Sequence, residues 1–216
     1  MSHIHTSRVK RASRAYPVVV HEVTKRPRGR PAAAERADVM ALATKQFMRG
    51  ERIDVQAIAA DLGLSRATVY RWFGSRERLV GEVLAALGEG VIRDARRYAR
   101  GSGPRRLLNA LDRVNRTLAA SMPLRRFLEA ERDAALHILT SSAGIVQPRT
   151  VAAVRETIEA EQARGNYSSP VDTDTLAYAI VRIAEAFLYN DAVAGIRGDV
   201  DRLLEVEALL LHVPAQ

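Results

Sequence analysis

The sequence IDVQAIAADLGLSRATVYRWFGSRERL, residues 53–79, predicts three short helices in close succession. Asp54 places a side-chain acceptor directly before apolar residues spaced i, i+3, i+4 and i+7, which is typical of a capped amphipathic helix of about two turns. Gly63 follows the last of them, where a glycine in the left-handed conformation ends a helix at little cost. Ser65 can then cap a second short helix and Ser75 a third. Two short helices joined by a tight glycine turn predict a helix-turn-helix, whose second helix enters the DNA major groove.

The outward side chains of the second helix suit a DNA interface. Arg66 can donate in a fork to guanine, and Thr68 can reach a base edge or a phosphate. Tyr70 and Arg71 can bind backbone oxygens of the duplex. A helical hairpin of a larger bundle that carries incidental charge has the same local pattern. The candidate DNA contacts in this stretch are Ser65, Arg66, Ala67, Thr68, Tyr70, Arg71, Trp72 and Arg76.

The order of residues in this stretch is more specific than its periodicity. It follows A-x-x-x-G-L-S-x-x-T-x-Y-x-x-F and then S-[KR]-E-x-L. The matching residues are Ala59, Gly63, Leu64, Ser65, Thr68, Tyr70, Phe73, Ser75, Arg76, Glu77 and Leu79. In these positions the chain resembles the TetR family of bacterial transcriptional regulators. Trp72 departs from the pattern, because many relatives carry His or Tyr there, and this departure puts one backbone contact in doubt.

The resemblance implies an all-α fold with two functional parts. A three-helix DNA-binding domain is joined by a connector helix to a C-terminal helical domain that binds a ligand and dimerises. Such a homodimer binds a pseudo-palindromic operator of double-stranded DNA. A small-molecule effector in the C-terminal domain then releases the protein from DNA, so that a repressor is the expected form.

Composition places few other limits on function. The chain has 216 residues, of which 47% are hydrophobic, enough for one good core or two small ones. No run approaches the roughly 18 uncharged apolar residues of a membrane span, and no apolar run follows the basic N-terminus as in a secretory signal. Because the chain has no cysteine, it has no disulfide framework. We therefore expect a soluble cytoplasmic protein.

Positive charge is concentrated in the N-terminal half. Residues 1–100 hold 20 Lys and Arg against 10 Asp and Glu, whereas residues 101–216 have a slight acidic excess. This asymmetry is typical of a polyanion-binding module joined to a neutral partner. A generally Arg-rich composition would explain the preference for Arg over Lys but not the asymmetry.

The first 31 residues carry a basic tail and a candidate arm. Residues 1–24 have no helical period, and we interpret them as a mobile basic tail. Residues 25–31, KRPRGRP, form a slim basic element that can lie in a narrow A·T-rich minor groove through Arg28 and Arg30. A solvated charged linker with loose phosphate contacts is the alternative. The DNA-binding domain, with arm and connector, is then expected at 25–100.

The remaining sequence is predicted to be entirely helical. The helix-breaking residues Gly101–Pro104 predict a domain boundary, so that residues 101–216 are expected to form the ligand-binding and dimerisation domain. The expected helices cover residues 32–48, 75–98, 104–120, 123–140, 149–164, 173–190 and 200–212. Apolar stripes on the last two helices fit a dimer interface between subunits, although one subunit alone could also bury them. These stripes are Leu176, Ile180, Ile183, Ala184 and Phe187, and Leu203, Leu204, Leu210 and Leu211.

No arrangement of residues indicates catalysis. Gly63-Leu64-Ser65 lacks the second glycine of a nucleophile elbow, and the sequence has no P-loop, no G-x-G-x-x-G and no H-E-x-x-H. His137 and His212 have no ligand partner at i+4. We therefore expect no enzyme activity, no metal and no cofactor.

A helical body of this size can instead enclose a small apolar molecule. Arg182, on an otherwise apolar helix face, is the best polar candidate, because it can meet a carboxylate or a carbonyl. It can equally pair with Glu185 or Asp174. The expected apolar contacts are Leu111, Val114, Phe127, Leu128, Ile138, Ile158 and Ile183, and the expected polar contacts are Asn115, Tyr178, Arg182 and Tyr189; ordinary core is the alternative for each.

Two further segments are similar to regulators of acyl-homoserine-lactone degradation in actinobacteria. These are AERADVMALATKQF at 34–47 and FLYND at 187–191. This similarity implies a fatty-acyl or lactone effector. Two other functions fit the sequence: a ligand-blind DNA-binding regulator whose body only dimerises, and a helical small-molecule carrier or interaction protein.

Overall fold

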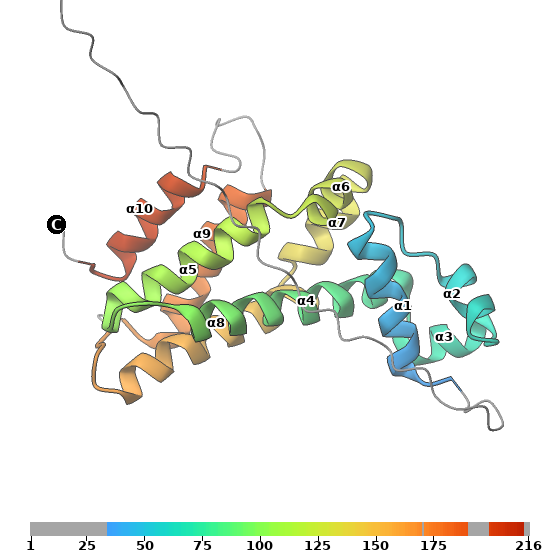
Figure 1. Cartoon of the computed structure of the whole chain (residues 1–216), viewed down its shortest axis with the longest axis horizontal. Helices are drawn as coiled ribbons and strands as arrows, with labels where there is room; N and C mark the ends of the chain where they lie inside the picture. The colour runs from blue at the N-terminus through green and yellow to red at the C-terminus, as the bar shows by residue number, and fades with distance from the viewer. Residues whose placement is uncertain (1–33, 170, 190–198, 214–216) are drawn as a thin grey trace, which may run out of the picture. The chain divides into compact units, whose positions relative to one another are not determined.

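The computed structural model describes residues 34–169, 171–189 and 199–213 (Figure 1). These residues belong to one compact unit that begins at Ala34. Within the described ranges the chain is α-helical and has no strand, so the expected all-α class is confirmed. The helices are α1 (Arg36–Met48), α2 (Val55–Asp61), α3 (Arg66–Phe73), α4 (Arg76–Tyr98), α5 (Gly103–Ala119), α6 (Met122–Ala130), α7 (Arg132–Thr140), α8 (Val146–Ala163), α9 (Thr173–Tyr189) and α10 (Val200–Leu210).

No helix in the described ranges combines the length and the apolar character that a membrane span requires.

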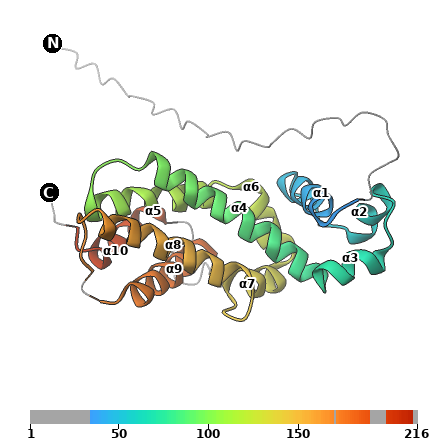
Figure 2. The same ribbon diagram turned by 90° about the horizontal axis from the view of Figure 1, so that it is seen from below.

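Helices α1, α2 and α3 pack together around a small apolar core, and α3 and α1 also contact α4 (Figures 1 and 2). Val39 of α1, Ile58 of α2 and Val69 of α3 are almost completely buried in this core. The predicted caps are present: the Asp54 side chain accepts from the Gln56 and Ala57 amides, at 2.8 and 3.1 Å. The glycine turn between α2 and α3 therefore has the conformation that the sequence predicts, with Gly63 at φ +65°.

Helix α4 is continuous over 23 residues, and it contacts α1 and α3 near its start and α5 and α8 along its length (Figure 2). Its internal glycines do not break it. Gly81 lies where a Cβ atom would meet Ile145 and Ile138 at 3.6 and 3.8 Å, whereas Gly88 has open space around its Cα. The helix contributes to two apolar clusters, through Val83 in the first and Ile92 in the second.

The structure corrects one predicted helix. The expected single helix at 123–140 is two helices, α6 and α7, which meet at Glu131. Glu131 has φ −135° and ψ 48°, outside the helical region, and its carboxylate contacts Arg76 of α4. The apolar positions of α6 and α7 keep a helical spacing across the break, and therefore the sequence gives no local sign of it.

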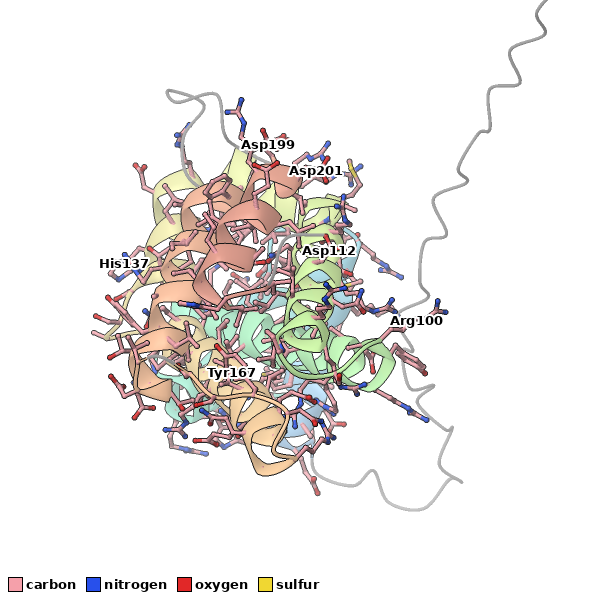
Figure 3. All side chains as sticks on the ribbon, turned by 90° about the vertical axis from the view of Figure 1, so that its left-hand side faces the viewer. Arg100, Asp112, His137, Tyr167, Asp199 and Asp201 are labelled. Atoms are coloured by element: carbon pink, nitrogen blue, oxygen red, sulfur yellow. The ribbon has the colours of Figure 1, made fainter. Side chains whose placement is uncertain are left out.

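Helices α5, α8, α9 and α10 surround the second half of α4 through α4–α5, α4–α8, α8–α9 and α10–α5 contacts. Arg116 of α5 joins α5 to α10, because it pairs with Asp112 and Asp201, each at 2.7 Å; Figure 3 shows both aspartates on these neighbouring helices. Parts of the predicted dimer stripes are buried inside this subunit, with Ile180 and Leu203 almost completely inaccessible. Each stripe is therefore partly buried within one subunit, which was the alternative to a dimer interface.

The domain division at residues 100 and 101 stays a proposal. The first cluster joins α1–α4 to α6, α7 and the start of α8, and the second joins the end of α4 to α5, α8, α9 and α10. Packing thus connects the helix-turn-helix to α6 and α7, which the sequence assigns to the other domain. The tail and the arm, residues 1–24 and 25–31, lie outside the described residues.

Candidate nucleic-acid interface and effector cavity

Helix α3 has one buried face and one exposed face. Val69 and Phe73 are buried against α1 and α4, which fixes the rotation of the helix. Arg66 and Arg71 are therefore exposed on the opposite side, and Ala67 lies beside Arg66 without shielding it. A rigid helix with exposed guanidinium groups on one side has the chemistry for base-edge and phosphate contacts.

Local contacts orient the other predicted residues of α3. The Ser65 hydroxyl accepts from the Thr68 amide at 3.1 Å, and the two hydroxyls lie 3.0 Å apart. The guanidinium of Arg66 lies over the Tyr70 ring, 5.8 Å from its centroid. Trp72 is half-buried and packs against the first apolar cluster, as does the Tyr70 ring. The packing of Trp72 agrees with the alternative that it serves the core.

Arg76 is the exception among the predicted DNA contacts. Its guanidinium donates to both carboxylate oxygens of Glu131, at 2.7 and 2.8 Å, and its Nε donates to the Ile53 carbonyl at 2.9 Å. Only 12% of the side chain is exposed. All three guanidinium nitrogens donate to groups within the protein, so the predicted contact of Arg76 with DNA is wrong. Arg28 and Arg30 lie outside the described residues.

A cavity of about 60 Å³ lies among α4, α5, α7, α8, α9 and α10. Four of the predicted ligand contacts line it, namely Leu111, Val114, Asn115 and Tyr189. Most of its other walls are apolar, including Ile92, Leu139, Val154 and Ile180. The body therefore contains a small, largely apolar space that these four predicted residues help to line.

The other predicted ligand contacts lie elsewhere. Phe127, Leu128 and Ile138 belong to the first apolar cluster, beside the helix-turn-helix. Tyr178 and Arg182 are exposed, and Arg182 pairs with Glu185 at 2.6 Å and donates to the Thr140 carbonyl at 3.0 Å. Two more residues do not line the cavity: Ile158 is core of the second cluster, and Ile183 is half-buried. None of these seven residues lines the cavity, and a ligand contact by any of them stays a prediction.

Two carboxyl groups that were not among the predicted contacts also line the cavity, Glu185 of α9 and Glu207 of α10. Both are buried, and the Asn115 amide donates to both Glu207 oxygens, at 2.9 and 3.0 Å. Glu207 stands four residues after Leu203 and four before Leu211, both of which are buried. An acidic residue inside an apolar helical stripe is the signal that could have identified it.

Burial controls the protonation of these groups. It raises the pKa of Glu207 to about 7, although the Asn115 amide favours the ionised form. Burial also raises the pKa of Glu185 to about 7, against the opposing charge of Arg182. The pKa of Tyr189 is raised by burial and by the charge of Glu185. A proton therefore binds to the cavity wall near neutral pH.

We expect Glu207→Gln to reduce the pH dependence of stability. In the folded protein the pKa of Glu207 is about 7, well above that of an unfolded glutamate, so the folded state holds its proton more tightly. This contribution to stability is full below about pH 4 and is lost as the pH rises to about 7, with a total of up to about 3 kcal/mol. The variant stays neutral, so its free energy of unfolding should decline less between pH 5 and pH 8.

Urea unfolding at both pH values measures this difference. Glu205→Gln is the matched control, because Glu205 is exposed on the same helix. Glu185, whose pKa is also raised to about 7, stays in both proteins and contributes a decline that they share. Parallel stability curves for Glu207→Gln and the wild type would contradict the assignment of the titrating group.

Comparison with known proteins identifies the chain. The family profile described as "Tetracyclin repressor-like, C-terminal domain" matches residues 102–212, which is more than half of the sequence. The chain belongs to the TetR family. It is a DNA-binding transcriptional regulator, as predicted from the helix-turn-helix and its flanking motif, and regulators of this family are not enzymes.

Relatives of this TetR-family regulator cover most of its length. It is 24% identical to the uncharacterised HTH-type transcriptional regulator YdgC of Bacillus subtilis (strain 168). The matching 160 residues cover 73% of this chain and 80% of YdgC. The R. erythropolis transcriptional repressor QsdR shares 28% identity and superposes with a TM-score of 0.76, over 84% of this chain and 96% of QsdR. The AlkX repressor of Dietzia sp. strain DQ12-45-1b has the same fold, with 20% identity and a TM-score of 0.53. The match covers 82% of this chain and 97% of AlkX.

Proposed function

We propose that this TetR-family regulator is a homodimeric repressor that binds a pseudo-palindromic operator and is released by a small apolar or acyl-chain effector. The observation that carries the proposal is the orientation of α3: Val69 and Phe73 are buried, and Arg66 and Arg71 are exposed. The similarity to QsdR, which is a transcriptional repressor, supports repression as the sign of regulation.

The proposed dimer would form through α9 and α10. Tyr178 of α9 is 49% exposed, and Leu209 of α10 is 77% exposed. A tyrosine and a leucine with this exposure could pack against a second subunit, since aromatic side chains are enriched in protein interfaces. A two-fold dimer would then present two α3 helices to the two halves of one operator.

The proposed effector would bind in the cavity between α4, α5, α7, α8, α9 and α10. It would shift the protein between operator-binding and released conformations only by the difference in its affinity for them. A tenfold to hundredfold fall in operator affinity requires a difference of about 1.4–2.8 kcal/mol. The apolar walls favour an alkyl or acyl chain over a fully polar ligand.

One observation favours a second function, a regulator that binds no ligand. The cavity of about 60 Å³ is far below the range of roughly 300–1,000 Å³ of ordinary ligand pockets. An effector therefore has to widen it by moving side chains. If no apolar or acyl compound raises the melting temperature of the full chain, the ligand-blind function is the better one.

Two substitutions on α3 test the DNA interface. We expect Arg66→Ala to weaken binding to the best operator by about tenfold to a hundredfold and to relax its base preference, because a bidentate guanine contact is worth roughly 1–3 kcal/mol. Arg71→Ala should instead weaken all duplexes similarly and reduce the salt slope of log K by about 1, because it contacts phosphate.

Fluorescence anisotropy at several salt concentrations separates the two effects, with DNA from upstream of the gene and a scrambled duplex as ligands. Arg105→Ala is the control, since it removes the same charge from an exposed position on α5. If Arg66→Ala keeps both the affinity and the base preference of the wild type, α3 is not the reading helix.

A further inference from the structure

A second hollow lies beside the cavity, where the end of α4 meets the start of α5 and the end of α8. Its volume is about 380 Å³. Among the described residues that line it are five arginines and one carboxylate, namely Arg93, Arg96, Arg97, Arg106, Arg164 and Glu161. We call this hollow the arginine cleft.

Two of the five arginines have structural partners within the cleft. Arg106 and Arg164 both pair with Glu161, which is buried. Arg106 also donates to the carbonyls of Ala99 and Arg96, at 2.7 and 3.1 Å. These contacts hold the α4–α5 connection to α8. They also leave the only carboxylate among the described lining residues, Glu161, paired with Arg106 and Arg164 and not with the other three arginines.

The other three arginines leave an excess of positive charge. Arg93, Arg96 and Arg97 are spaced i, i+3 and i+4 on α4, so like charges lie on one helix face, which destabilises a helix by roughly 0.2–0.5 kcal/mol per pair. Arg96 is 3.7 Å from Glu156, and both side chains are substantially exposed to solvent. Within the described residues Arg93 and Arg97 make no ion pair. The helix dipole favours cations only in the last turn, and Arg93 precedes that turn.

The position of these arginines argues against contact with the same DNA as α3. Arg93 follows Arg76 by 17 residues along one continuous helix, which is about 25 Å at 1.5 Å per residue. Helix α3 contacts α4, and the chain passes from α3 to the start of α4 within three residues. The arginine cleft is therefore at the end of α4 away from the reading helix.

The arginine cleft adjoins the apolar cavity. Arg96, Ala110 and Thr157 line both spaces, so the cavity and the arginine cleft share part of their walls. A molecule that crosses this boundary would meet alkyl side chains on one side and guanidinium groups on the other. Guanidinium groups bind carboxylate and phosphate in bidentate geometry.

We propose that the effector is an amphiphilic anion, whose alkyl chain enters the apolar cavity while its carboxylate- or phosphate-bearing head group binds Arg93, Arg96 and Arg97 in the arginine cleft. This inference rests on the proposed function and names the chemical class of its effector. The cleft has more room than a single carboxylate needs, and therefore it also accommodates a bulky phosphorylated head. Arg96 lies at the boundary, where the head joins the chain.

The test uses the full-length protein and four probes with the same ten-carbon chain, all kept below their micelle concentrations. Decyl phosphate and decanoate carry anionic heads, decan-1-ol has a neutral head and decyltrimethylammonium is a cation. We expect both anions to bind at least about tenfold more tightly than decan-1-ol in calorimetry and to raise the melting temperature. The tighter of the two anions identifies the head group, and decyltrimethylammonium should not bind.

The double variant Arg93→Ala/Arg97→Ala tests the head-group contacts. Both side chains are exposed, so we expect it to fold, and it should bind the better anion at least about tenfold more weakly while its affinity for decan-1-ol is unchanged. Arg105→Ala, which removes an exposed charge on α5 outside the cleft lining, should keep the affinity for the anion.

The inference is overturned if decan-1-ol binds as tightly as both anions, if the double variant keeps wild-type affinity for them, or if no anion binds. Operator binding of the unliganded protein is measured in the same preparation. Loss of the anion effect with intact operator binding refutes the effector class alone. Absence of operator binding refutes the proposed function, and the calorimetric titrations still decide whether the cleft binds an anion.

Discussion

Replacing Glu131 by alanine is expected to lower the free energy of unfolding by about 2–4 kcal/mol. Glu131 accepts two hydrogen bonds from Arg76, and the side chains are only 16% and 12% exposed. Removing one partner of a buried ion pair costs about 3–5 kcal/mol, because the remaining charge is left without compensation. We expect a value at or below this range, since both groups keep some contact with water and Arg76 retains the Ile53 carbonyl.

The same contact has a functional consequence. Arg76 begins α4, Ile53 precedes α2, and Glu131 separates α6 from α7. The pair therefore fixes the helix-turn-helix to the part of the body that packs beneath it. Loss of this contact should also weaken operator binding, because α3 would no longer be held in one orientation.

Urea unfolding of Glu131→Ala, Arg76→Ala and the double variant measures the coupling between the two residues. Glu129→Ala is the matched control, since Glu129 is exposed on α6 and should change stability by less than about 0.5 kcal/mol. If the double variant is as unstable as the sum of the two single variants, the ion pair does not stabilise the fold.

The second large effect is expected at Gly103, the first residue of α5. Gly103 has φ +54°, and a Cβ atom there would lie 2.2 Å from the carbonyl oxygen of Asn166. Its amide also donates to Glu161 at 3.2 Å. Gly103→Ala therefore combines an unfavourable backbone conformation with a clash against backbone, and we expect a loss of about 3 kcal/mol or more.

Gly165→Ala separates these two causes. Gly165 has φ +70° but no atom within 4 Å of the position of a Cβ, so its replacement should cost only about 1–2 kcal/mol. For a chain of this size a loss of 3 kcal/mol lowers the melting temperature by roughly 6–12 °C. Equal melting temperatures for the two variants would mean that the contact between Gly103 and Asn166 has no effect on stability.

The helix-turn-helix was predictable because its determinants are local. Asp54, Ser65 and Ser75 each accept from amides two or three residues ahead, so the cap is encoded within four residues of sequence. Gly63 and Gly74 have positive φ, which few other residues adopt. The orientation of α3 follows from the spacing of Val69 and Phe73.

The apolar cavity was predictable only in part. Leu111 and Val114 line it as expected, because they share the inward face of α5 with Asn115. Phe127 and Ile138 have an equally apolar pattern, but they pack beside α4 and the first cluster instead. Helical periodicity predicts that a side chain is directed inward, whereas it does not identify the neighbouring helix.

The amino-acid sequence by itself determined the capped helix-turn-helix, the exposed Arg66 and Arg71, and the all-α class, since each depends on residues a few positions apart. Tertiary structure alone decided that Arg76 binds Glu131, 55 residues away, rather than remaining a free phosphate contact. It also decided that Glu207 bonds to Asn115 and that the arginines of α4 adjoin an apolar cavity. The physical reason is that ion pairs and cavities depend on the packing of distant helices, which no local spacing of residues specifies.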